Sequence, residues 1–130
     1  MIRDPLADFV TRIRNASSAH NTLVVIPHSK FKLALAEKLE KEGYIGAVSK
    51  KGKKINKQIE LVLKYEEDIP RIEGIERISR LSKRIYFKAH NVRPVKFGHG
   101  TMILTTPKGI LTDREARKEK VGGEPILKIW

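Results

Sequence analysis

The chain has 130 residues, a net charge of +12 and a pI near 10.1, and it contains no cysteine. The absence of cysteine excludes disulfide bonds, Cys-ligated zinc and thiol catalysis. A cation this strong has a nucleic acid or an anionic membrane as its expected partner, and no apolar run approaches the roughly 18 residues of a membrane span. Residues 1–65 carry +7 and residues 66–130 carry +5. Both halves are therefore expected to face one polyanion; the alternative is a basic surface that only keeps the protein soluble.

The first half of the chain, residues 1–65, predicts the order α-β-α-β-β. Asp4-Pro5 has the pattern of a helix start, with an N-cap carboxylate followed by proline at the first helical position. Ser29 is expected to cap a second helix and Gly43 to end it. Strands are expected over residues 22–26, where Pro27 stops the strand, and over residues 44–48 and 59–65.

The second half, residues 66–130, predicts mostly strands and one short helix. The acidic segment 66–70 is the best internal boundary. Thr112 and Glu115 have the spacing of a capping box, and the helix that they start is expected to end near Lys120. Strands are expected over residues 75–78, 84–87, 101–105 and 126–130. The predicted fold class is α+β rather than doubly wound.

A hydroxyl-rich loop at residues 105–109 is the first candidate site. The hydroxyls of Thr105 and Thr106 can donate and accept hydrogen bonds, which suits phosphate oxygens and ribose hydroxyls. Lys108 adds a positive charge, and Gly109 allows a backbone to come close. The residues alone equally favour an ordinary hairpin turn.

Tyr86 is the second candidate. On a strand, Arg84, Tyr86 and Lys88 would share one face, with Ile85 and Phe87 on the other. A basic face with a central aromatic residue is a platform on which nucleobases stack. The alternative is a partly buried tyrosine between solvated cations, and the global charge favours the binding role.

Two basic segments in the first half add candidate phosphate contacts. The N-terminus of the second helix, with Ser29 and Lys30, presents backbone N–H groups and the positive end of the helix dipole. Capping by Ser29 is compatible with such a contact. Residues 50–57 hold five lysines and are expected to form a hairpin tip that adds affinity without specificity.

The segment Gly122-Gly123-Glu124 permits tight backbone approach, and a carboxylate there can accept from a base amino group. Spacing alone favours a turn in which Glu124 pairs with a nearby lysine. The sequence contains no metal-ligand spacing, Walker loop or G-x-S-x-G elbow. We therefore expect no enzyme activity, no cofactor and no metal.

These segments together resemble the bacterial small-subunit ribosomal protein S8 family over nearly the whole length. The matching motifs are Asp4-Pro5-Leu6-Ala7-Asp8, Thr11-Arg12-Ile13-Arg14-Asn15, Lys41-Glu42-Gly43-Tyr44-Ile45, Arg77-Ile78-Ser79, Arg84-Ile85-Tyr86, Lys108-Gly109, Thr112-Asp113-Arg114-Glu115-Ala116-Arg117 and Gly122-Gly123-Glu124. The resemblance implies an N-terminal α/β lobe, residues 1–65, packed on a C-terminal β-rich RNA-binding lobe with one short helix, residues 66–130.

The resemblance also implies a structural role in the cytoplasm, within the ribosome. Members bind the central domain of small-subunit ribosomal RNA early in assembly, beside small-subunit ribosomal proteins five and twelve. In some bacteria they repress translation of their own operon mRNA. No membrane contact is implied. The alternative from the residues alone is a sequence-tolerant nucleic-acid-binding protein or RNA chaperone.

By position, the resemblance assigns RNA contacts to two patches. The first is the loop that inserts into an irregular RNA helix, with its flanking residues: Thr105, Thr106, Lys108, Gly109, Tyr86, Arg84, Gly123 and Glu124. The second belongs to the N-terminal lobe: Ser29, Lys30 and Arg14. This assignment favours binding over a simple turn at residues 105–109 and at Glu124.

The sequence departs from the family pattern at three places. Pro107 replaces a hydroxyl residue, which removes a side-chain donor and a backbone N–H from the loop. Leu81-Ser82 stands where the family typically has Pro-Gly. Pro125 replaces a strand residue and is expected to delay the start of the last strand.

Overall fold

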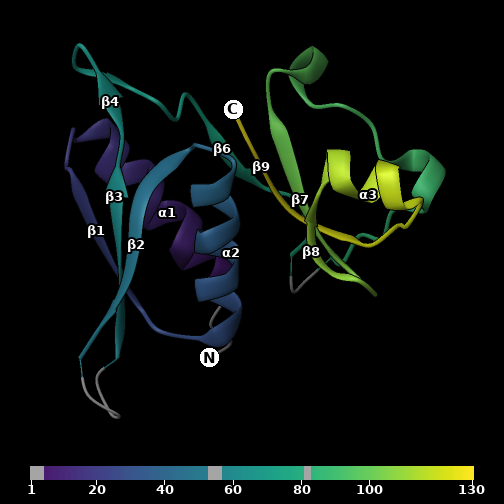
Figure 1. Ribbon diagram of the computed structural model, residues 1–130, viewed down its shortest axis with the longest axis horizontal. Helices are drawn as coiled ribbons and strands as arrows, with labels where there is room; N and C mark the ends of the chain where they lie inside the picture. The colour runs from purple at the N-terminus through teal and green to yellow at the C-terminus, as the bar shows by residue number, and fades with distance from the viewer. Residues whose placement is uncertain (1–4, 53–56, 81–82) are drawn as a thin grey trace. The chain divides into compact units, whose positions relative to one another are not determined.

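Two helices and a three-stranded sheet make up the N-terminal unit, residues 5–73, in this computed structural model, which describes residues 5–52, 57–80 and 83–130. The elements are α1 (Pro5–Ser18), β1 (Leu23–Pro27), α2 (Lys30–Lys41), β2 (Ile45–Lys51) and β3 (Gln58–Leu63). The sheet is antiparallel with the order β1-β3-β2 (Figure 1). A small hairpin, β4 (Tyr65–Glu66) and β5 (Ile69–Pro70), follows it.

One face of this sheet is buried because apolar residues alternate along its strands. On β3, Ile59, Leu61 and Leu63 are buried, whereas Val62 is exposed. The helices contribute their own buried residues to the same core, including Phe9, Ile13, Leu35 and Leu39, all at 0 % exposure. Both helices therefore bury an apolar stripe, as amphipathic helices of a small core do.

The ends of α2 follow the predicted capping. The Ser29 hydroxyl accepts the backbone N–H of Lys32 at 3.1 Å, so it satisfies one of the helix's unpaired donors. Gly43 has φ +83°, the left-handed conformation that glycine adopts at a helix end. The helix therefore begins and ends where the sequence predicted.

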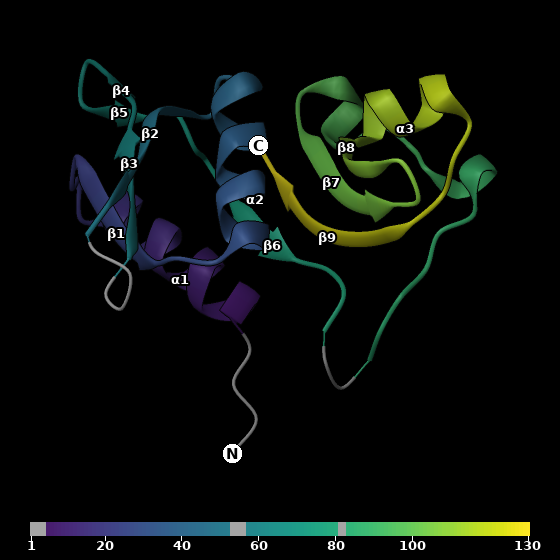
Figure 2. The same cartoon turned by 60° about the horizontal axis from the view of Figure 1, so that its bottom comes forward.

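The C-terminal unit, residues 74–130, is a four-stranded antiparallel sheet with one α-helix. Its elements are β6 (Ile75–Arg77), the short 3-10 helices η1 (Ala89–Asn91) and η2 (Lys96–Gly98), β7 (Thr101–Thr106), β8 (Gly109–Thr112), α3 (Asp113–Glu119) and β9 (Glu124–Ile129). The strand order is β6-β9-β7-β8. Figure 2 shows the curved strands β7 and β9 side by side, with α3 beside them.

Helix α3 is fixed to this sheet at its first turn. Thr112 and Glu115 form the predicted capping box, and Lys120 ends the helix in the left-handed conformation. The buried Asp113 accepts the backbone N–H of Met102 at 3.1 Å and pairs with Arg117 at 2.8 Å. A core under the helix contains Val92, Val95, Met102, Leu104 and Ala116.

The structure corrects three expectations about strands. Residues 84–87 do not form a strand; only Phe87 pairs, as an isolated bridge to Gly123. Pro27 is the last residue of β1, so the strand ends at the proline and not one residue before it; an edge strand such as β1 tolerates proline. Pro125 does not delay β9, which begins at Glu124; it lies at the irregularity where β7 and β9 shift register, a usual place for proline.

The unit boundary differs from the expected position, and three expected features lie outside the described residues. The compact units change over between Glu73 and Gly74, whereas the sequence placed the boundary at 66–70, which here spans the β4–β5 hairpin. The predicted N-cap at position 4, the middle of the lysine-rich tip at positions 53–56, and positions 81–82 lie outside the described residues.

Candidate nucleic-acid interface

The loop predicted at residues 105–109 is a tight turn between β7 and β8. Thr106 pairs with Gly109, which leaves only Pro107 and Lys108 at the tip. The Thr106 hydroxyl is buried in the turn, where it donates to the Gly109 carbonyl at 2.8 Å and accepts the Lys108 N–H at 3.1 Å. Thr105 is exposed. The two threonines therefore differ: the Thr106 hydroxyl holds the turn, and the Thr105 side chain faces solvent.

Two glycines join this turn to the segment that carries Tyr86. A Cβ on Gly123 would collide with the carbonyl oxygen of Thr105, and a Cβ on Gly122 would collide with that of Phe87. Gly123 and Phe87 also exchange two backbone hydrogen bonds of 2.9 Å. Glycine is therefore required at both positions for packing, because the backbone of two other segments occupies the space where a Cβ would lie.

Glu124 is held by an arginine and a serine rather than by a lysine, which corrects the alternative drawn from spacing. Arg84 donates to both carboxylate oxygens, at 2.7 and 3.0 Å, and the buried Ser79 donates a third hydrogen bond. The hydrogen bond from Arg84 lowers the pKa of Glu124, so this carboxylate stays ionised. The Glu124–Arg84 pair is therefore close to neutral toward an approaching phosphate.

Tyr86 lies in the irregular segment between Ser79 and Phe87, and its side chain is 65 % exposed. Arg84 and Lys88 are exposed as well, whereas Ile85 and Phe87 are half-buried. The predicted two faces thus exist without a strand. The Ser79 hydroxyl, which accepts the Ile85 N–H at 3.1 Å, helps fix this segment beside β9.

We call the exposed side chains Tyr86, Thr105 and Lys108 the turn surface. The first two belong to segments that both contact Gly123, so they lie at one end of the C-terminal sheet. Lys108 is at the tip of the adjoining turn, where its ammonium pairs with Glu119 of α3 at 2.9 Å. The hydrogen bond from Lys108 lowers the pKa of Glu119. An aromatic ring, a hydroxyl and an ammonium at one edge can stack on a base and bind phosphate.

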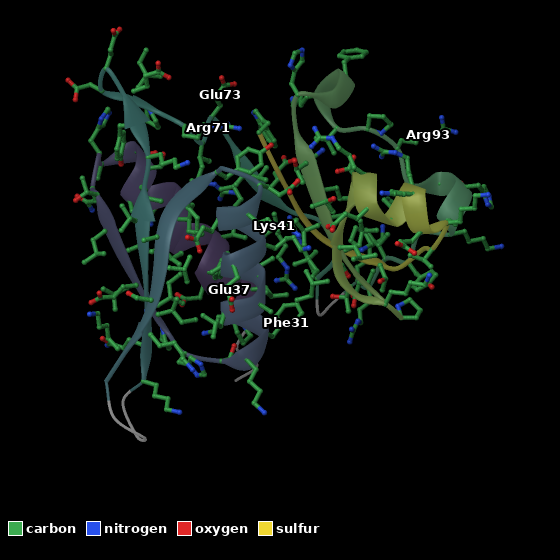
Figure 3. All side chains as sticks on the ribbon, viewed as in Figure 1. Phe31, Glu37, Lys41, Arg71, Glu73 and Arg93 are labelled. Carbon is green, nitrogen blue, oxygen red and sulfur yellow. The ribbon has the colours of Figure 1, made fainter. Side chains whose placement is uncertain are left out.

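The second predicted patch lies in the N-terminal unit. Lys30 and Arg14 are exposed, and Ser29 is half-buried while it caps α2. Lys32, within the first turn of α2, is largely buried, and desolvation lowers its pKa. Figure 3 labels the exposed Phe31 in the first turn of α2, and Glu37 and Lys41 further along its exposed side. Because the later positions carry both signs of charge, an anion site on this helix is restricted to its first turn.

Sequence reasoning missed the two groups that organise the turn surface. Ser79 and Glu119 each bind a residue of the predicted site, yet neither belongs to a pattern that indicates such a role. Their partners are 45 and 11 residues away in the chain, so only the folded structure brings them together. Ser79 could have been singled out only by its burial, because buried polar residues usually bind a partner. No helix or strand periodicity in the surrounding sequence predicts that burial.

Within the described ranges, no group of three or more His, Asp or Glu side chains is placed to hold a metal ion. Across the same part of the chain, no helix is long and apolar enough to cross a membrane.

Comparison with known proteins gives one family. The profile described as "Ribosomal protein S8" matches residues 4–130. A protein of Mycoplasmopsis pulmonis named small ribosomal subunit protein uS8 is 46% identical over 130 residues, 100% of this chain and 98% of that protein. Proteins of the same name from Persephonella marina and a Polaromonas species are 46% and 48% identical; the aligned parts cover 100% and 97% of this chain and 100% and 96% of those proteins. The chain belongs to the ribosomal protein S8 family.

Proposed function

We propose that the protein is a structural, non-catalytic constituent of the small ribosomal subunit. In this proposal it binds the central domain of small-subunit ribosomal RNA through the turn surface. The observation that carries the proposal is the junction at Gly123, which brings an exposed aromatic residue and an exposed hydroxyl to one edge of a cationic unit. Family membership and the net charge of +12 support the same partner.

Affinity and specificity would have separate sources. Lysine and arginine contacts to phosphate supply affinity that falls with salt, by roughly 0.9 in log–log slope per neutralised phosphate on a duplex. Tyr86 and Thr105 supply specificity, because unpaired bases in an irregular RNA helix can stack and form hydrogen bonds. The patch of Ser29, Lys30 and Arg14 would contact a second RNA segment. Neighbours would be small-subunit ribosomal proteins five and twelve, and repression of the protein's own operon mRNA would use the same turn surface.

The competing function is sequence-tolerant nucleic-acid binding or RNA chaperone activity, which the net charge alone would support. A filter-binding titration separates the two functions. It compares a central-domain ribosomal RNA fragment with a scrambled RNA of the same composition, at two salt concentrations. A cognate preference that persists at the higher salt supports the proposal; equal affinities that fall together with salt would refute it.

Two threonine variants test which side chain contacts RNA. Thr105→Val removes an exposed hydroxyl and should weaken cognate binding by about 1–3 kcal/mol with little effect on stability. Thr106→Val removes both hydrogen bonds inside the turn, so it should lower the free energy of unfolding by about 1–2 kcal/mol and weaken RNA binding indirectly. Filter binding and urea denaturation measure both. Wild-type RNA affinity for Thr105→Val would contradict the role of the exposed hydroxyl.

A further inference from the structure

Phe97 is the most exposed large apolar residue in the part of the chain that the structure describes, at 102% of its reference area. Its backbone is left-handed, with φ 56° and ψ 33°, and Lys96 before it and Gly98 after it also have positive φ, at 49° and 93°. Left-handed backbone is uncommon for a bulky residue such as phenylalanine. The protein thus uses an unfavourable backbone conformation to place an aromatic ring entirely in solvent.

The loop that carries Phe97 is held at several points. Val95 and Gly100 form a bridge, and the Val95 carbonyl accepts the N–H groups of Gly98 and Gly100 at 2.9 and 3.0 Å. The Arg114 guanidinium donates to the Gly98 carbonyl at 2.9 Å. The Lys96 ammonium lies 4.6 Å from the centre of the Trp130 ring. Because the bonds fix both sides of the tip, the outward position of the ring is a property of the fold.

The charge of the C-terminal unit identifies the kind of partner. Residues 74–130 contain 13 lysines and arginines and five acidic residues. Each acidic residue already has a partner within the unit, as five pairs show: Glu76 with Lys128, Asp113 with Arg117, Glu115 with the Thr112 N–H, Glu119 with Lys108, and Glu124 with Arg84.

What remains around the loop is positive. Lys96 is next to Phe97 in the chain. Its ammonium contacts the Trp130 ring, which is neutral, so the positive charge of Lys96 is not cancelled. Arg93 is exposed on the segment that leads into the loop, and Figure 3 shows its side chain at the outside of the unit. An aromatic ring among cations, with the carboxylates of the unit already engaged by other groups, matches a nucleobase on a polyanionic backbone better than an apolar protein pocket.

We propose that Phe97 stacks on an unpaired RNA base, at a contact separate from the turn surface. Strand β7 runs from this loop to the turn, so its six residues separate the two sites by about 20 Å. The C-terminal unit would then hold RNA at both ends of one strand. This contact goes beyond the proposed function, because stacking on an unpaired base does not depend on which RNA the turn surface recognises.

Trp130 provides a local measurement, because it is the only tryptophan in the chain and contacts Lys96. The probe is a 12-nucleotide oligouridylate, compared with an RNA of equal length whose central bases are removed. Both carry the same phosphates, so a difference in affinity comes from the bases. We expect the oligouridylate to change Trp130 fluorescence on binding and to bind the full-length protein more tightly than the abasic RNA.

Three variants test the ring itself. Phe97→Asn removes the ring with a residue that tolerates left-handed backbone, and it should lower oligouridylate affinity roughly five- to a hundredfold while leaving abasic RNA unaffected. Phe97→Tyr should retain binding. Ile69→Ala, which removes another exposed apolar side chain, should change neither affinity.

Wild-type oligouridylate affinity and an unchanged Trp130 response in Phe97→Asn would overturn the inference. That result would leave an apolar pocket of a protein as the partner of the ring. It would not affect the proposed function, which is measured separately with the ribosomal RNA fragment and Thr105→Val.

Discussion

Glu124 shows how a single carboxylate can organise the backbone beside a candidate RNA-binding surface. It accepts hydrogen bonds from Arg84 and from the buried Ser79, and Ser79 in turn accepts the backbone N–H of Ile85. The carboxylate therefore positions the segment that carries Tyr86 and reduces the positive charge at Arg84. Its role in this structure is internal, and any contact with a base would have to compete with these bonds.

The free energy of unfolding should depend on the ionisation of Glu124. The hydrogen bond from Arg84 lowers its pKa below the ordinary 4.5 in the folded protein, so the unfolded chain binds the proton more readily. The stabilisation is present above 4.5 and is lost as pH falls through the lower folded value. Glu124→Gln should therefore be less stable than wild type near neutral pH, and the difference should narrow in acid.

Urea denaturation of both proteins, at a series of pH values from neutral to acidic, measures this. Glu119→Gln is a control for a carboxylate whose pKa is also lowered but whose ion pair with Lys108 is exposed, so its effect should be smaller. Parallel curves for wild type and Glu124→Gln over the whole range would show that the Arg84 and Ser79 bonds do not stabilise the ionised carboxylate.

At the level of elements, the sequence was most informative where local chemistry sets the structure. Ser29 and the Thr112–Glu115 capping box start their helices where predicted, because capping involves residues only three apart. The alternation on β3 likewise predicts its buried face. The segment 84–87 also alternates, yet Arg84 turns to Glu124 and only Phe87 pairs. An alternating pattern predicts two faces, but a strand also needs a neighbouring strand in register.

For the candidate site, the sequence nominated residues but gave no indication of how they are arranged. Thr105 and Thr106 are neighbours of the same type, and only their opposite exposure separates a turn-forming hydroxyl from a solvent-facing one. Gly123 was expected to allow close approach, and the structure identifies the approaching group as the Thr105 backbone. Such long-range contacts depend on the sheet order β6-β9-β7-β8, which no local pattern encodes.

The contacts at Gly123 predict a specific loss of stability. In Gly123→Ala the added Cβ collides with the Thr105 carbonyl, and neither backbone can move without breaking the pairing of β7 with β9. We expect the free energy of unfolding to fall by about 1–3 kcal/mol, the usual cost of overpacking. Gly46→Ala is the milder comparison, because its Cβ would lie 3.3 Å from the Val62 carbonyl, which is a tight contact rather than a collision. Urea denaturation measures the free energy of unfolding of both variants. A Gly123→Ala variant as stable as the wild type would mean that the backbone around Gly123 can shift to accommodate the added Cβ.

At the scale of the whole molecule, the charge of +12 is distributed over both units, so electrostatic attraction to RNA need not reside in the turn surface. The exposed lysines at the end of β2, Lys50 and Lys51, belong to the strand that pairs with β3 in the N-terminal unit. A point charge on a flexible side chain contacts phosphate without regard to sequence. Affinity and specificity should therefore be separable by mutation.

Lys51→Ala tests that separation. If Lys51 touches phosphate, the variant should weaken cognate and scrambled RNA by the same factor and lower the slope of log affinity against log salt by about one unit. Lys128→Ala is the matched control, because Lys128 pairs with Glu76 at 3.3 Å within the C-terminal sheet, and it should leave the slope unchanged. Titrations of both RNAs at several salt concentrations provide the measurement. A loss confined to the cognate RNA would assign Lys51 to recognition, because a contact to phosphate alone cannot distinguish two RNAs of equal charge.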